Sequence, residues 1–326
     1  MNAFAQPNRR LVFVLFALVA LVAVGCDTVG SRGTLAPRSP DSGTIAPSSP
    51  EPTAPAETPA PTADPGSTAT PGSTPTTTPR PTVTPSGATS VKVYLFVEGT
   101  LVPVQRSVDA TRAVGRAALT ELFEGPTAAE AGASPALTTS VPAGTILLGL
   151  DIADGLATVD LSREFESGGG SASMFGRLAQ VVYTLTQFPT VDRVAFRLDG
   201  QPVTVFSGEG IVLDGPSVRT DYESFLPAMF VDRPAWGGTL ANPARVTGLA
   251  NVFEASFFIE LRDEDGVTLA NEHVMATCGT GCWGTFDVTL GYEVRSRQQG
   301  SLIVYNLSAR DGGIEQVRTY PVTLVP

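Results

Sequence analysis

Apolar and polar residues alternate from residue 91 onward, and the spacing of the apolar positions changes along the chain. The first run has a period of two, which predicts a strand whose apolar face is made of Val91, Val93, Leu95 and Val97. In the next segment the apolar residues recur about every four positions. That spacing predicts a helix capped by Asp109 and ended by Gly125 and Pro126.

Residues 145–162 hold two apolar runs on either side of the turn dipeptide Asp154-Gly155, which predicts a β-hairpin. A second helix is predicted from about Ser171, with an apolar stripe made of Phe175, Leu178, Val181, Val182 and Leu185. Residues 191–200 read as a further strand, and residues 203–206 as one more short one. The order β-α-β-β-α-β, with two helices over one face of a small sheet, predicts an α+β domain.

Helical spacing disappears after about Phe225, and short strand-like runs separated by turn residues take its place. The turns include Asp265-Gly266 and Asp311-Gly312-Gly313. One run places four apolar side chains on the same face, namely Ala255, Phe257, Ile259 and Leu261. About seven short strands over roughly a hundred residues predict an all-β sandwich.

The segment before both domains cannot form a core. Residues 26–90 hold 14 of the 27 prolines, with Ser, Thr, Gly and Ala between them and no apolar period. This composition predicts a disordered linker that is partly polyproline II.

The first 26 residues predict export and anchoring. Arg9 and Arg10 precede the uninterrupted apolar run 11–24, which is typical of a signal peptide and short for a membrane span. Ala23-Val24-Gly25-Cys26 resembles a bacterial lipobox, although Leu would be usual at the position of Ala23. We therefore expect a lipid on Cys26, the alternatives being a cleaved signal peptide or an uncleaved anchor with an incidental cysteine.

The charge of the chain excludes one class of partner. Its 32 acidic and 21 basic residues give a net charge of −11, which argues against nucleic acid as a partner. Lys92 is the only lysine.

Several separate blocks resemble one known family. "VYLF", "ALTELFEGP", "SVPAGTILLGLDIADGLATVDLSREF" and "QVVYTLTQFPTVDRVAFRLDG" occur in order and look like the GerMN domain of sporulation and spore-germination lipoproteins. The following "RPAWGGTLANPARVTGLANVFEASF", with Gly248, Phe253 and Glu254, resembles the immunoglobulin-like domain of bacterial spore-germination proteins. The resemblance implies no catalytic residue. It implies modules that pack side by side, and unpaired edges of the small sheet, with Val93 on its first strand, are the surface expected to do so.

The other cysteines, Cys278 and Cys282, lie in the glycine-rich segment "CGTGCWG". In an exported chain we expect a local disulfide that shapes a surface presenting Trp283, with free thiols or half of a metal site as the alternatives. His273, the only histidine, is expected at a strand surface or edge. No nucleophilic elbow or set of metal ligands accompanies it, so no catalytic residue, metal or cofactor is predicted.

These observations predict four segments: a signal peptide at 1–25, a linker at 26–90, a GerMN-like domain at 91–213 and an immunoglobulin-like domain at 224–326. The expected protein is a non-catalytic binding or assembly protein, lipid-anchored on the extracytoplasmic face of the cytoplasmic membrane. Its partners would be another envelope protein, peptidoglycan or copies of itself. A solute-binding lipoprotein and, behind it, a cell-wall hydrolase are the alternatives; an interdomain pocket of ligand size would favour the former, and flat unpaired sheet edges would favour assembly.

Overall fold

The first sheet is a hairpin with one short strand added. In the computed structural model, which describes residues 87–326, β1 (Ala88–Val97) pairs antiparallel along its whole length with β2 (Thr100–Asp109). Glu98 and Gly99 both have positive φ, as a tight two-residue hairpin turn requires. β3 (Leu137–Thr138) adds to the end of β1, so the strand order is β2-β1-β3.

The second sheet contains the predicted hairpin. β4 (Leu147–Ala153) and β5 (Gly155–Leu161) flank Asp154, which has a φ of 51°. β6 (Val191–Leu198) pairs parallel to β5, and β7 (Gln201–Pro202) completes the order β4-β5-β6-β7. Two further short strands, β8 (Val205–Phe206) and β9 (Ile211–Val212), pair only with each other. The hairpin prediction is confirmed, whereas the expected single small sheet is wrong because these strands divide among separate sheets.

Three α-helices and two 3-10 turns accompany these sheets. They are α1 (Val114–Glu124), α2 (Ala128–Ala131), α3 (Ser171–Leu185), η1 (Arg163–Glu166) and η2 (Arg219–Phe225). Asp109 does not cap α1, because it still pairs with Ala88 at the end of β2, and the helix starts only at Val114. The predicted stripe of α3 is buried except at Phe175, which is 40% exposed.

Helix α3 and the turn that follows it carry polar side chains that complete β1. Gln187 accepts a hydrogen bond from the Lys92 N–H and donates one to the Lys92 carbonyl, at 2.8 and 2.6 Å. Within α3, Thr184 accepts from the Tyr94 N–H and Gln180 donates to the Tyr94 carbonyl. The helix therefore satisfies the backbone of β1 where β3 does not reach it, which explains why Gln180 and Thr184 are fully buried.

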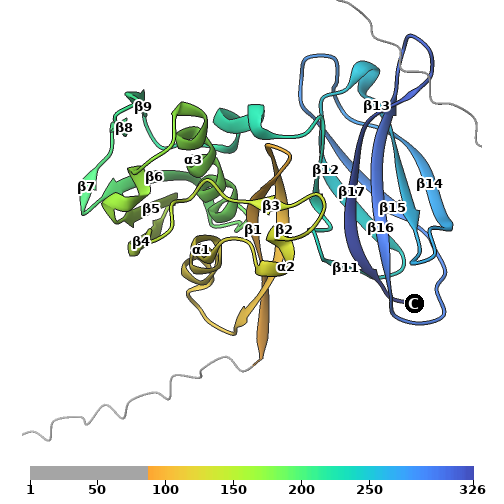
Figure 1. Cartoon of the computed structure of the whole chain (residues 1–326), viewed down its shortest axis with the longest axis horizontal. Coiled ribbons are helices and arrows are strands. Elements are labelled where there is room, and N and C mark those ends of the chain that lie inside the picture. The colour runs from red at the N-terminus through yellow and green to blue at the C-terminus, as the bar shows by residue number, and fades with distance from the viewer. Residues whose placement is uncertain (1–86) are drawn as a thin grey trace, which may run out of the picture. The chain divides into compact units, whose positions relative to one another are not determined.

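The second domain is a sandwich of two antiparallel-based sheets, drawn from cyan to blue in Figure 1. One sheet has the order β10-β12-β15 and the other the order β11-β17-β16-β13-β14. The strands are β10 (Met229–Arg233), β11 (Thr239–Leu240), β12 (Ala244–Ala250), β13 (Ser256–Arg262), β14 (Thr268–Met275), β15 (Gly284–Leu290), β16 (Gln298–Leu307) and β17 (Ile314–Leu324). A short 3-10 turn, η3 (Phe253–Ala255), leads into β13. The predicted sandwich is confirmed.

Alternate side chains of β13 point into the interior of the sandwich. All four residues predicted to share a face are buried, and Phe257 meets Phe286 of the opposite sheet edge-on at 5.0 Å between ring centroids. Gly248 on β12 lies directly under the Phe286 ring and beside the Phe230 carbonyl, so a Cβ there would collide with both. Phe253, from the same sequence block, is 54% exposed and belongs to η3.

Candidate binding site at the junction of the two domains

Backbone hydrogen bonds join the two domains directly, within one compact unit that contains all the described residues. The Trp236 N–H donates to the Pro103 carbonyl at 2.7 Å, and the Gln105 N–H donates to the Trp236 carbonyl at 3.1 Å. These bonds form a parallel bridge between Trp236 and Val104 of β2. The outer edge of β2 is thereby closed at its middle, and the sandwich is fixed against the first sheet.

A cluster of charged and phenolic side chains lies beside this bridge. The Lys92 ammonium donates to Oδ2 of Asp232 at 2.6 Å and to the Asp232 backbone carbonyl at 3.2 Å. The Tyr94 hydroxyl donates to the other carboxylate oxygen, Oδ1, at 2.5 Å. Lys92 and Tyr94 come from β1 and Asp232 from β10, so the carboxylate of one domain binds two donors of the other.

Arg219, on the segment that connects the domains, completes the cluster. Its guanidinium lies 4.7 Å from the ring centroid of Tyr183 and 5.4 Å from that of Tyr94. Its Nη1 is 3.7 Å from Oδ1 of Asp232, and its Nε donates to the Thr186 hydroxyl at 2.8 Å. The connecting segment is thus held to α3 and to β10 together.

The electrostatics of the cluster favour an ionised Asp232. Burial alone would raise the pKa of this carboxyl, but Lys92 and Arg219 outweigh burial and hold the pKa below its ordinary value. Burial lowers the pKa of Lys92, and Asp232 only partly offsets this because Arg219 and Arg233 repel the same ammonium. Burial also raises the pKa of Tyr94 far above its ordinary value. Two cations therefore share one carboxylate.

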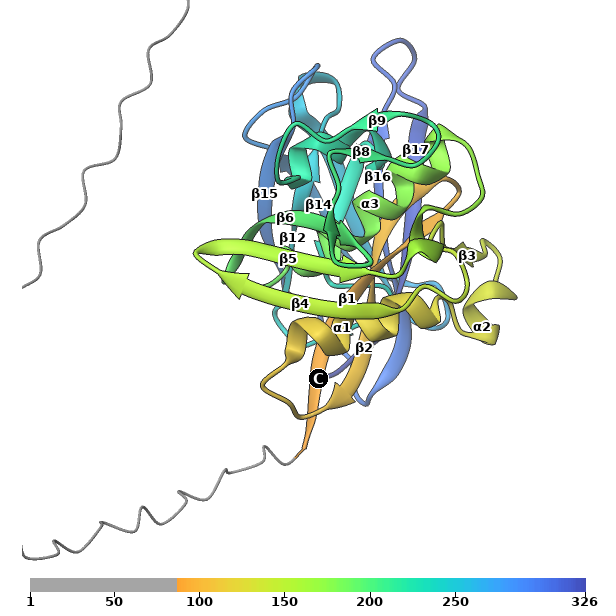
Figure 2. The same cartoon turned by 90° about the vertical axis from the view of Figure 1, so that its left-hand side faces the viewer.

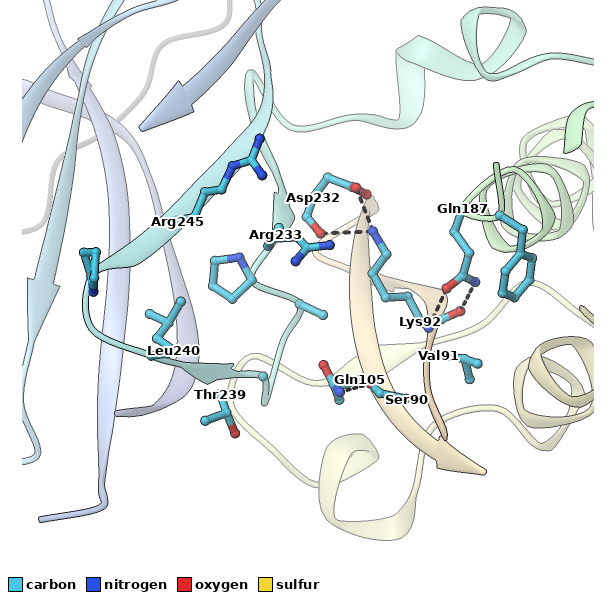
Figure 3. A pocket seen from close by; sticks show the side chains of 16 residues that line it. Ser90, Val91, Lys92, Gln105, Gln187, Asp232, Arg233, Thr239, Leu240 and Arg245 are labelled. Atoms are coloured by element: carbon cyan, nitrogen blue, oxygen red, sulfur yellow. Dashed lines mark hydrogen bonds and ion pairs between the residues drawn. The ribbon is translucent and has the colours of Figure 1, made fainter. Parts of the chain in front are cut away.

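A pocket of about 720 Å³ opens next to this cluster. One wall comes from β1, β2 and the end of α3, and the other from residues 232–245 of the sandwich. Figure 3 shows Lys92 and Asp232 meeting from opposite walls, with Arg233 and Arg245 on the sandwich side. A second hollow of about 840 Å³ shares Asp232 and Arg245 with it and continues over β12 and β15. The first volume is within the usual range of small-molecule sites.

The pocket could not be predicted from the sequence. Lys92 was conspicuous as the only lysine, but its partner Asp232 is 140 positions away. An alternating strand pattern says which side chains are buried and says nothing about which distant segment covers them.

Comparisons with known proteins agree with this two-domain structure. Residues 92–204 match the family model described as "Sporulation and spore germination", and residues 228–313 match the one described as "Immunoglobulin-like domain of bacterial spore germination". The chain joins a GerMN domain to a spore-germination immunoglobulin-like domain. The resemblance inferred from the sequence blocks is confirmed.

A curated relative and two solved structures resemble parts of the GerMN-containing chain. Lipoprotein LpqB of Thermobifida fusca (strain YX) is 32% identical over 140 residues, 43% of this chain and 21% of that protein, so the chain spans about a fifth of the relative's length. The first GerMN domain of the sporulation protein GerM from Bacillus subtilis is 25% identical, with 41% of this chain and 99% of that one covered and a TM-score of 0.36. The tandem GerMN domains of GerM are 18% identical, with 64% of each chain covered and a TM-score of 0.38.

Two of the three cysteines singled out from the sequence lie in the second domain, and the third lies outside the described residues. The structure joins Cys278 to Cys282 in the loop between β14 and β15 of the immunoglobulin-like domain. The pairing in the exported protein stays a prediction, which non-reducing peptide mapping checks. Trp283 is not presented on the surface as expected, because it is partly buried against the core of the sandwich. Cys26, its predicted lipid and nearly all of the predicted linker lie outside residues 87–326.

The remaining candidates give no sign of catalytic chemistry. His273 is exposed on the edge strand β14, as predicted, and its Nε2 is 2.7 Å from the Ser256 hydroxyl. Within residues 87–326 no three His, Cys, Asp or Glu side chains gather as metal ligands would. In the same part of the chain no helix combines the length and apolar character needed to cross a membrane.

Proposed function

We propose that this chain is a lipid-anchored envelope protein whose two domains bind and assemble and do not catalyse a reaction. The two domain families and the lipoprotein relative support an envelope protein of the sporulation and germination type. The lipobox-like sequence before Cys26 supports the anchor on the extracytoplasmic face of the cytoplasmic membrane. Another envelope protein, peptidoglycan and copies of the same chain are the proposed partners.

The observation that carries the assembly proposal is the outer edge of β4. This strand is the last of its sheet, and among the residues that the structure describes no strand pairs with its outer side (Figure 2). Leu148 is 48% exposed and Ile152 is 39% exposed, and Ile146 beside the strand is 58% exposed. An open apolar edge of this kind favours pairing with another strand.

The sequence of β4 is compatible with pairing to a second copy of itself. In an antiparallel pair centred on Leu150, Leu148 of one copy faces Ile152 of the other. Asp151, the only charged residue of the strand, then faces Gly149, and the two carboxylates do not oppose each other. Anchoring in a membrane would raise the local concentration of the chain enough for a weak contact of this kind to form.

Full-length protein tethered to a supported bilayer tests the assembly. We expect single-molecule brightness to show clusters that grow with surface density, and Leu148→Lys to reduce them strongly. Val317→Lys is the matched control, because Val317 is similarly exposed, at 57%, on β17 of the other domain. Wild-type protein that stays monomeric at high density would refute the assembly half, and cleavage of peptidoglycan by purified protein would refute the non-catalytic half.

The anchor is tested separately with Cys26→Ser. The wild-type protein should partition into detergent and carry two acyl chains on a new N-terminal cysteine in mass spectra. The variant should do neither, and an acylated variant or an unacylated wild type would show that the anchor is assigned to the wrong residue.

The junction pocket favours a second function, that of a solute-binding lipoprotein. Its volume and its position between two domains fit a ligand site. Its walls come from a small GerMN domain and a sandwich, whereas typical binding proteins close two lobes about a hinge. We therefore place ligand binding second, as an activity of the same anchored protein. No observation in the described residues favours the cell-wall hydrolase.

A further inference from the structure

We propose that the junction pocket binds a small oxyanion, a carboxylate or a phosphate group carried on an apolar body. The inference rests on the second of the two functions above, ligand binding, and names the chemistry of its ligand. Three cationic side chains, Lys92, Arg233 and Arg245, line the pocket, and Asp232 is the only acidic one there. The whole chain has a net charge of −11, so this local excess of positive charge is opposite in sign to the charge of the chain.

Each of the three cations has hydrogen-bonding capacity to spare. Lys92 directs its ammonium at two oxygens of Asp232, which leaves one of its three protons. The Arg233 side chain makes no hydrogen bond and no ion pair within residues 87–326, although its backbone belongs to β10 and pairs with Thr247. Arg245 binds Asp287 through Nε and Nη2, but both side chains are more than half exposed, so water competes for this pair.

The rest of the lining determines what else the ligand can carry. Phe188, Pro234 and Leu240 supply apolar surface, and Ser90, Gln105 and Thr239 supply neutral hydrogen-bonding groups. Guanidinium and ammonium groups bind planar carboxylates and phosphates with charge-assisted hydrogen bonds. An anion with an apolar body would satisfy both parts of the lining, whereas a bare cation would meet repulsion from three sides.

The sole lysine gives a direct readout of binding. Acylation of Lys92, the only ε-amine of the chain, can be followed by mass spectrometry of the peptide that contains it. A bound anion would shield this amine and favour its protonated, unreactive form. We would use phenyl phosphate and benzoate as probes, because they share a ring and differ in the charged group, with benzyl alcohol as the neutral probe.

In full-length protein we expect one or both anionic probes to protect Lys92 from acylation in a saturable way, and we expect no protection by benzyl alcohol. Protection by only one of them would identify the charged group. Arg233→Gln should raise the probe concentration needed for half-protection about tenfold, since it removes one charge-assisted contact. Arg310→Gln is the control, because Arg310 is exposed at the β16–β17 turn and pairs only with Asp311.

Three outcomes would overturn the proposal: no saturable protection by either anion, equal protection by benzyl alcohol, or unchanged half-protection in Arg233→Gln. Arg245→Gln is a second variant, in case Arg233→Gln does not fold as judged by its melting curve, and the same loss is expected. Clustering on bilayers does not involve this pocket. Normal clustering without anion protection would therefore reject this inference alone, and anion protection without clustering would reject only the assembly proposal.

Discussion

The two larger sheets of the GerMN domain differ in how the backbone at their edges is hydrogen-bonded. In the first sheet the free side of β1 is completed by Gln180 and Thr184 of α3 and by Gln187 in the turn after it, and β2 is closed by Trp236 of the sandwich. In the second sheet α1 packs against Leu150 and Ile152 of β4, but no described strand or side chain hydrogen-bonds to the outer edge of β4, and apolar side chains remain exposed there. The edge of β1 is therefore closed by side chains, whereas the outer edge of β4 stays available for pairing.

This difference also corrects the surface expected from the sequence. The first strand was expected to offer an unpaired edge near Val93, but Val93 is fully buried in the strand between β2 and the α3 side chains. A contact with another chain would require α3 to leave. The proposed assembly surface is therefore the edge of β4 and not that of β1.

The largest expected effect is that of Val93→Lys. An ammonium group at this buried position has no partner and no access to water, so we expect the domain to fail to fold. Circular dichroism and the yield of soluble protein measure this, with Val93→Ile as the conservative control. A Val93→Lys protein with a normal melting curve would mean that the β1 region is as open as β4.

Gln180→Ala tests whether the α3 side chains close the β1 edge. The substitution leaves the Tyr94 carbonyl and the Ser140 N–H without partners in a buried place, and we expect a loss of about 2–4 kcal/mol in the free energy of unfolding. Urea denaturation measures the loss. Gln299→Ala on the exposed side of β16 is the matched control and should change stability by less than about 0.5 kcal/mol. Equal effects of the two substitutions would contradict the capping role.

Asp232→Asn tests the charged cluster at the junction. The carboxylate is 28% exposed, so we expect a loss of about 1–3 kcal/mol, less than for a fully buried ion pair. Because the folded pKa of Asp232 lies below its ordinary 3.8, its contribution is present above about pH 4 and is lost as the pH falls through the folded pKa. The difference between wild type and variant in urea denaturation should therefore shrink below about pH 4. Asp287→Asn, at the pair with Arg245 whose side chains are both more than half exposed, should have little effect on stability.

Leu148→Lys is expected to have the smallest effect on folding. The Lys head group at this half-exposed position reaches water, so the free energy of unfolding should change by less than about 0.5 kcal/mol while clustering on bilayers falls. Thermal unfolding in dilute solution measures the first and single-molecule brightness the second. A large loss of stability would show that Leu148 belongs to the core, and the edge would then be closed like that of β1.

Much of the local structure was predictable because its causes lie within a few residues. The turn at Asp154-Gly155 and the end of α1 before Gly125 follow from positive φ values, and most of the buried stripe of α3 follows from its apolar spacing. The hairpin at Glu98-Gly99 carried the same kind of signal, an acidic residue and a glycine between two alternating runs, yet β2 was not predicted. Pro103 lowers the strand propensity of β2. The strand tolerates this proline because the backbone of Pro103 points away from β1, where its carbonyl accepts from the Trp236 N–H, so the missing N–H costs no bond to β1.

The candidate site could not be predicted from the sequence, because its residues come from segments that are far apart in the chain. Gln180 and Thr184 are polar residues within a mostly apolar helix, and the spacing of the helix does not show that they bind the backbone of β1. Lys92 and Asp232 belong to different domains, so no periodicity relates them.

The sequence by itself determined the two domain types, the sandwich and most strands and helices, because apolar spacing and turn residues act locally. Only the tertiary structure decided that the strands of the first domain divide into separate sheets, which edges are closed and where a pocket opens. Those properties depend on hydrogen bonds and ion pairs between residues about 90 to 140 positions apart, such as Gln187 with Lys92 and Lys92 with Asp232. Such contacts form only once the chain has been packed, because a polar side chain acquires its partner from whichever segment covers it.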